Sequence, residues 1–161
     1  MIETIPTKKL LILQSLILLG GTVFAWSKLI PQLRDFLALY GTFFRFRDCV
    51  IPNPFLTACF YGSAAFLVAL FWSLAIYQNP SYASERRLRN FLLFGVVFAA
   101  SVVSYEAALY YKLLAAGSVP VTCTPGVSPI ETPCFTGMLF FIAAFTFSFS
   151  VTRRLRLIGT V

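Results

Sequence analysis

Four long apolar stretches divide the chain, and shorter stretches rich in proline, cysteine or charge separate them. The apolar stretches cover residues 10–30, 55–78, 91–115 and 134–152. Each approaches or exceeds the ~20 residues that a helix needs to cross the apolar core of a bilayer. The pattern predicts an all-α protein, a four-transmembrane-helix bundle formed by a single membrane domain over residues 1–161.

The composition agrees with this prediction, since 58% of the residues are hydrophobic and only 12% are charged. A soluble domain of this length does not have enough interior to bury that much apolar surface. The first apolar stretch follows Lys8 and Lys9 and lacks a small-residue cleavage site. We therefore expect a retained membrane anchor and not a signal peptide that is removed.

Small residues recur four positions apart within the apolar stretches. This spacing lets neighbouring helices approach closely in a membrane and favours one packed bundle. Chance spacing among abundant small residues is the alternative for any single pair. The residues concerned are Gly21 with Ala25, the series Ala65, Ala69 and Ser73, and Gly95 with Ala99.

The net charge of +7 is distributed in a way that indicates membrane lipid, and not nucleic acid, as a partner. With four crossings, eight basic residues share one side of the membrane and five lie on the other, and the richer side is expected to be cytoplasmic. We expect an integral protein of a bacterial inner membrane, with cytoplasmic termini and external cysteine loops. The eight residues are Lys8, Lys9, Arg86, Arg87, Arg89, Arg153, Arg154 and Arg156.

Pro31 is expected to end the first helix, and residues 32–48 then form an amphipathic interfacial segment in the first external loop. Within it, apolar side chains recur at helical spacing on one face, as in helices that lie at a membrane surface. The segment is interpreted either as a lid over the mouth of the bundle or as a plain interfacial anchor. The apolar face consists of Leu33, Phe36, Leu37 and Tyr40.

The four cysteines fall into two similar arrangements, one in each half of the chain. Cys49 and Cys59 flank one proline-containing loop, and Cys123 and Cys134 flank another. In both halves the second cysteine begins the pattern Cys-Phe-x-Gly, close behind a proline that suits the first turn of a helix. We interpret the halves 1–78 and 79–161 as a parallel repeat. The alternative is that apolar helices align with one another easily.

The available chemistry is narrow, because the chain contains no histidine. Histidine-dependent catalysis and histidine-ligated metals are therefore excluded, and the cysteines lack the short spacing of zinc sites, so no metal is expected. The cysteines are interpreted either as two structural disulfides, each closing its own loop, or as exchanging dithiols. Four cysteines allow three pairings, and the sequence does not decide among them.

Two cysteine pairs on the external side of four helices resemble the layout of the vitamin K epoxide reductase and disulfide-bond-formation protein B families of membrane thiol oxidoreductases. The resemblance implies electron transfer between external dithiols, such as those of a thioredoxin-like protein, and a quinone-like carrier. It implies that Cys59 and Cys134 lie near the carrier and exchange with Cys49 and Cys123. Those families carry Cys-x-x-Cys at a helix start, where this chain has glycine in place of the second cysteine.

Three further residues are candidates for this chemistry. Glu106 lies in the outer part of the third apolar stretch and is interpreted either as a proton-handling residue, with Lys28 as its counter-charge, or as an interfacial glutamate that reaches water. Phe141 and Phe145 are interpreted either as the lining of a quinone pocket or as lipid-facing residues. The alternative to an enzyme is an accessory subunit of a membrane complex, with two disulfide-stapled loops that dock a partner.

Overall fold

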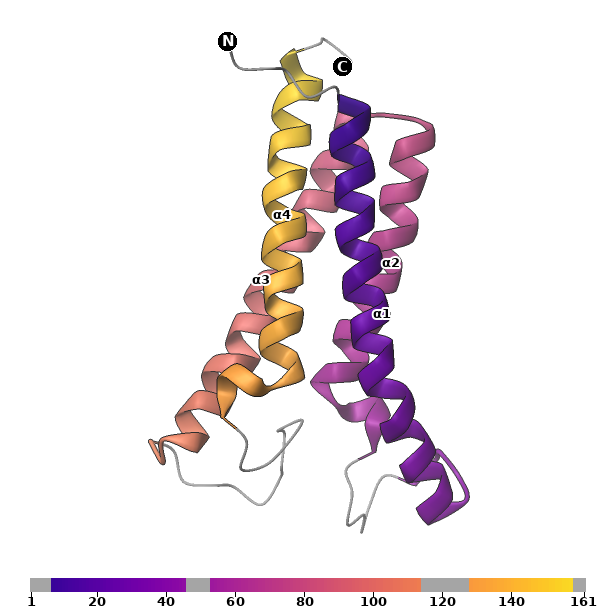
Figure 1. The fold of residues 1–161 in the computed structure, drawn as a ribbon, viewed down its shortest axis with the longest axis vertical. Helices are drawn as coiled ribbons and strands as arrows, with labels where there is room; N and C mark the ends of the chain where they lie inside the picture. The colour runs from indigo at the N-terminus through magenta and orange to yellow at the C-terminus, as the bar shows by residue number, and fades with distance from the viewer. Residues whose placement is uncertain (1–6, 46–52, 114–127, 158–161) are drawn as a thin grey trace.

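The computed structural model describes residues 7–45, 53–113 and 128–157, and it forms a bundle of four long helices (Figure 1). Every long helix is long and apolar enough to cross a membrane, and the described residues contain no strand. The all-α four-helix fold is therefore confirmed, and the protein is an integral membrane protein. The helices are α1 (Thr7–Tyr40), α2 (Ala58–Gln78), α3 (Tyr82–Tyr110) and α4 (Pro133–Leu157), with short 3-10 helices η1 (Pro54–Leu56) and η2 (Pro129–Glu131) before α2 and α4.

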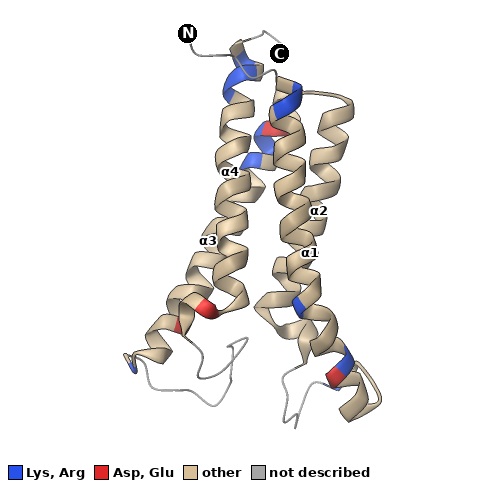
Figure 2. Cartoon of the chain, viewed as in Figure 1, with Lys and Arg blue, Asp and Glu red and all other residues tan. Residues whose placement is uncertain are grey.

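The helices pack so that α1 contacts α2 and α4, while α3 contacts α4 and, less extensively, α2. Basic residues at the start of α1, the start of α3 and the end of α4 gather at one end of the bundle (Figure 2). Their common end was predicted from the even number of crossings. The assignment of that end to the cytoplasm stays a prediction.

Pro31 does not end the first helix, contrary to the prediction. α1 continues through Pro31 to Tyr40, so the expected interfacial segment begins as an extension of the same helix. Proline removes one backbone hydrogen bond, and membrane helices tolerate this loss where water or neighbouring groups satisfy the carbonyl. The 34 residues of α1 span about 51 Å at 1.5 Å per residue. The helix is thus longer than the ~30 Å apolar core of a bilayer, and one end extends beyond that core.

The end of α1 packs back on the chain that follows it. Phe36 is fully buried, and its ring lies 4.7 Å from that of Tyr40, whereas Leu37 is exposed. The side-chain amide of Asn53 donates to the carbonyl oxygens of Phe43 and Arg45, at 2.8 and 3.0 Å. The predicted apolar face is therefore used in part for packing within the protein. Residues 46–48 of the predicted segment lie outside the described residues.

The centre of the bundle is a stacked pair of aromatic rings. Phe66 of α2 and Phe141 of α4 have ring centroids 4.0 Å apart and planes inclined by 18°. Gly21 of α1 lies against the Phe66 ring, and Gly95 of α3 lies against the Phe141 ring. The predicted small-residue positions thus make room for aromatic rings at the centre of the bundle.

α2 and α4 use equivalent positions for packing. When Cys59 is aligned with Cys134, four buried positions of the two helices coincide, and one of them is a serine in both helices. This correspondence is the pattern that a parallel repeat would leave, and duplication of the chain stays a prediction. The matched pairs are Phe66 with Phe141, Ala69 with Ala144, Ser73 with Ser148, and Ile76 with Val151.

A buried polar cluster joins three helices near the basic end. The carboxylate of Glu85 in α3 accepts hydrogen bonds from the amide of Gln14 in α1 (3.1 Å) and the hydroxyl of Ser148 in α4 (2.5 Å). All three side chains are fully buried. A second pair, Ser15 and Ser73, joins α1 to α2 at 2.8 Å. Buried hydrogen bonds of this kind fix the register of the helices, because a shifted helix would leave polar groups unsatisfied.

Adding a methyl group at either central glycine is expected to destabilise the bundle. A Cβ atom would lie 2.6 Å from a Phe66 ring carbon at Gly21 and 2.7 Å from a Phe141 ring carbon at Gly95. The rings are stacked on each other, so neither can move freely. Gly21→Ala and Gly95→Ala should each lower the free energy of unfolding by about 1 to 3 kcal/mol, the usual cost of overpacking. Thermal unfolding in detergent micelles measures the change.

The matched control for these variants is Gly62→Ala. No atom lies within 4 Å of a Cβ placed at Gly62, and alanine is the better helix former, so this variant should be neutral or slightly stabilising. Equal unfolding temperatures for all three variants would contradict the proposed central packing.

Loss of the Glu85 carboxylate is expected to weaken the contact among α1, α3 and α4. Glu85→Ala leaves Gln14 and Ser148 without the acceptor they share in the buried cluster. We expect the free energy of unfolding to fall by about 2 to 3 kcal/mol, the cost of unsatisfied buried polar groups. The measurement is unfolding by denaturant or heat in micelles. Glu131→Ala, at an exposed position, is the control and should change stability by less than about 0.5 kcal/mol. Equal effects of the two variants would be evidence against the cluster.

Candidate functional site

Two identical turns place the second cysteine of each half. The hydroxyl of Thr57 donates to the carbonyl oxygen of Pro54 (2.7 Å) and accepts from the N–H of Phe60 (3.4 Å). Thr132 makes the same two bonds, to Pro129 (2.8 Å) and from the N–H of Phe135 (3.4 Å). A threonine in this position caps the helix that follows it. The pattern Pro-x-x-Thr-x-Cys-Phe-x-Gly is therefore one structural unit that occurs twice.

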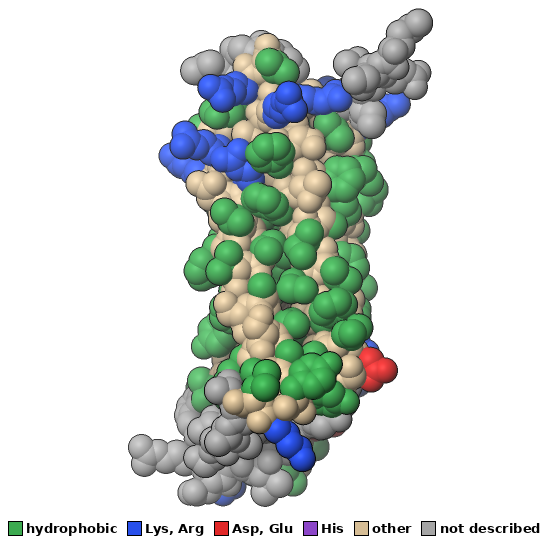
Figure 3. Space-filling model, turned by 90° about the vertical axis from the view of Figure 1, so that its left-hand side faces the viewer, with side chains coloured by type: hydrophobic (Ala, Val, Ile, Leu, Met, Phe, Trp, Pro, Cys, Tyr) green, Lys and Arg blue, Asp and Glu red, His purple; other side chains and the backbone are tan. Residues whose placement is uncertain are grey.

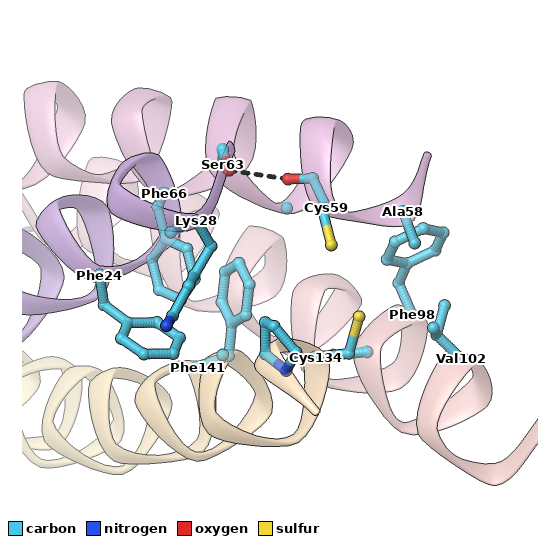
Figure 4. Close-up of a pocket in the computed structure, with 15 residues that line it drawn as sticks. Phe24, Lys28, Ala58, Cys59, Ser63, Phe66, Phe98, Val102, Cys134 and Phe141 are labelled. Atoms are coloured by element: carbon cyan, nitrogen blue, oxygen red, sulfur yellow. Dashed lines mark hydrogen bonds between the residues drawn. The ribbon is translucent and has the colours of Figure 1, made fainter. Parts of the chain in front are cut away.

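Each unit puts its cysteine in the first turn of a helix, where the helix dipole stabilises a thiolate. Cys59 is the second residue of α2, and Cys134 is the second residue of α4. Both side chains are half-buried. Their sulfur atoms point toward each other into one pocket between the two halves of the protein (Figure 4). The equivalent positions of the two halves thus face a common space.

The pocket is a cavity of about 60 Å³ that is partly open to the surroundings, and all four long helices contribute to its wall. Its surface is almost entirely apolar. Phenylalanine rings come from each helix, and the stacked rings at the centre of the bundle lie at its inner end (Figure 4). Because the cavity is partly open, a ligand larger than the cavity can enter it with one end. The phenylalanines are Phe24, Phe66, Phe98 and Phe141.

Lys28 supplies the charged group of this pocket. Its ammonium nitrogen lies 5.9 Å from the centroid of the Phe24 ring, one turn earlier on α1. The hydroxyl of Ser63 also lies in the wall, but it donates to the carbonyl oxygen of Cys59 at 2.7 Å. The pocket therefore combines apolar walls, aromatic faces, two sulfur atoms and one cation. Such a lining suits an apolar ligand with a polar or electron-rich end.

Among the predicted site residues, the structure brings Cys59, Cys134 and Phe141 together in the pocket wall. Phe145 is not in that wall; it lies one turn farther along α4 and packs against the hydrophobic core, and its role in ligand binding stays a prediction. Cys49 and Cys123 lie outside the described residues. Their pairing with the other cysteines stays a prediction.

Glu106 is buried in the last two turns of α3, with 5% of its surface exposed. The interpretation of a glutamate that reaches water is therefore wrong. Glu106 follows Val102 by one helical turn, so the two residues share a face of α3. Val102 lines the pocket, and Glu106 consequently lies one turn beyond the pocket wall, on the side away from the central rings. The ion pair with Lys28 stays a prediction.

Sequence reasoning missed the two threonine caps and the buried role of Glu85. The caps have a signal, since Thr57 and Thr132 stand at the same place before Cys-Phe-x-Gly. Glu85 also has one, because it begins a helical stripe that continues through Leu88, Leu92 and Gly95, all buried. The run of arginines around Glu85 favours a solvated surface instead, and so the stripe is easily overlooked.

Comparison of the chain with protein-family models, with curated proteins and with solved structures finds no match.

Proposed function

We propose that this protein is a membrane thiol–disulfide oxidoreductase that passes electrons between external dithiols and a quinone-like carrier. The observation that carries the proposal is the shared pocket. Two cysteines from equivalent positions point into one apolar cavity walled by aromatic rings. A relay of this kind requires a thiol beside an apolar carrier, and the pocket meets that requirement.

The reaction that we propose balances in two exchanges. An external dithiol attacks a disulfide of the protein, so the substrate is oxidised to its disulfide and the protein gains two thiols. The two protein thiols then form a disulfide again and release two electrons and two protons. A quinone accepts both electrons and both protons and leaves as the quinol. Cys59 and Cys134 are proposed next to the carrier, with Cys49 and Cys123 as their exchange partners.

The pocket residues have separate tasks in this scheme. The helix dipoles of α2 and α4 stabilise the thiolates that attack a disulfide. Phe66 and Phe141 close the inner end of the pocket and offer flat faces to a planar ring. The Lys28 ammonium attracts the electron-rich end of a ligand. Glu106, one turn beyond the wall, is proposed to accept protons that leave on the external side.

The second candidate function is an accessory subunit of a membrane complex. The repeated turn favours it, because a threonine cap two residues before each cysteine gives a rigid anchor for a disulfide-stapled external loop. In that case the cysteines are structural, and the loops dock a protein partner. The reduction potentials of the cysteines separate the two functions.

Measurement of these potentials in membranes is the first test. Structural disulfides have reduction potentials below about −300 mV, and exchanging ones are more oxidising. The potentials are measured by graded reduction, alkylation and mass mapping of Cys59 and Cys134. We expect at least one cysteine pair to have a reduction potential well above that value. Cys134→Ser should abolish turnover while the unfolding temperature stays near that of the wild type. If both pairs remain oxidised down to about −300 mV, the relay is excluded and the accessory subunit is favoured.

Filling the pocket is expected to block the carrier without touching a cysteine. A side chain at Gly62 extends into space, since no atom lies within 4 Å of a Cβ there, and Gly62 lines the pocket. Gly62→Leu should slow reduction of a soluble quinone analogue by at least about tenfold, the effect of about 1.4 kcal/mol. The potentials of the cysteines should not change.

The control for pocket filling is Ser101→Leu, which adds similar bulk at an exposed position of α3 outside the pocket wall. It should leave the rate unchanged. An unaffected rate in Gly62→Leu would exclude this pocket as the carrier site, whatever the potentials of the cysteines.

A further inference from the structure

The first turns of α3 carry a groove that the proposed function does not use. The groove has a volume of about 340 Å³ and lies at the basic end of the bundle, opposite the cysteine pocket. One face of the helix forms it, because its residues follow one another at steps of one, three or four positions. It is lined by Tyr82, Ala83, Arg86, Arg87 and Asn90.

Within the described part of the chain, no carboxylate is paired with the two guanidinium groups of this groove. Glu85 is the only acidic residue among the described residues of this end, and it precedes both arginines directly. Its side chain is fully buried on the other side of α3, bonded to Gln14 and Ser148. Arg86 and Arg87 are exposed. The positive charge of the groove is therefore available to an anion, and planar guanidinium groups suit phosphate oxygens in particular.

The surface next to the groove is apolar along the same helix face. From Arg86 and Asn90 the face continues to Phe94 and Val97, whose side chains are 68% and 56% exposed. Basic side chains near one end and hydrophobic side chains over the middle also mark the face shown in Figure 3. A molecule that covers this face needs an anionic head and an apolar tail.

We propose that this face of α3 binds one anionic phospholipid, with the phosphate in the groove and an acyl chain along Phe94 and Val97. The charge of Arg86 and Arg87 selects the head group, and the exposed apolar stripe selects a lipid over a soluble anion. Tyr82 lines the groove and packs against the hydrophobic core, and tyrosines are enriched at the level of lipid head groups. Basic pockets on transmembrane helices, where positive charge lies beside apolar surface, recognise the head groups of anionic lipids.

The test is native mass spectrometry of the full-length protein, titrated with phosphatidylglycerol or with phosphatidylcholine of the same acyl chains. We expect the wild type to bind phosphatidylglycerol more tightly. Arg86→Gln with Arg87→Gln should weaken phosphatidylglycerol binding about 30-fold, the factor for roughly 1 kcal/mol per basic residue. Phosphatidylcholine binding should hardly change. Both positions are exposed, and thermal unfolding verifies that the variant is folded.

The matched control removes the same charge from the same end of the bundle. Lys8→Gln with Lys9→Gln alters two exposed residues of α1 that do not line the groove, and it should weaken phosphatidylglycerol binding by less than about threefold. An equal loss in both double variants would show diffuse attraction and overturn the site. Displacement of the lipid by inorganic phosphate at similar concentration would overturn it too, because the apolar stripe would then contribute nothing.

Discussion

The stacked rings of Phe66 and Phe141 are the contact on which the bundle depends. They join α2 to α4 across the middle, and each ring occupies the space left by a glycine, Gly21 on α1 or Gly95 on α3. Lipid tails are as apolar as the protein, so burial of apolar surface alone does not hold membrane helices together. Close packing at such a point must supply the attraction instead. The same rings close the inner end of the cysteine pocket, so the contact that packs the bundle also determines the shape of the site.

Much of the fold was predictable, because a bilayer limits the protein to helices of a certain length. The four apolar stretches located the four long helices. Pro31 was misjudged, since a proline ends a helix more readily in water than near a membrane, where the rest of the helix has strong reasons to persist. The apolar stretches cover only part of two helices, because α3 also includes Arg86 and Arg87, and α4 extends to Leu157. Hydropathy marks the part of a helix that lies in lipid, not its full length.

The site was predictable in its residue types and not in its geometry. The pattern Cys-Phe-x-Gly led to Cys59 and Cys134, and duplication suggested that their surroundings would be alike. Their meeting in one pocket depends on how α2 and α4 face each other, and that follows from ring packing between residues far apart in the sequence. Phe145 shows the limit: it shares a helix face with Phe141 in the sequence, yet only Phe141 reaches the pocket wall. Helical periodicity predicts which residues share a face of one helix. It does not predict how far along that face a pocket between helices extends.

The two ends of the bundle differ in a way that bears on the proposed chemistry. Between the cysteine pocket and the Glu85 cluster lie the stacked rings and the apolar core around them. This core is mainly apolar, and the Ser15 and Ser73 hydroxyls buried in it are hydrogen-bonded to each other, so proton movement along the bundle axis is unfavourable. In the proposed enzyme, the protons released by oxidation of Cys59 and Cys134 are therefore expected to leave on the side where the pocket opens, and Glu106 is a buried carboxyl one helical turn beyond the pocket wall on α3. In the proposed enzyme, electrons and protons then enter and leave at the same end, and the opposite end is left to hold the helices in register and to contact lipid.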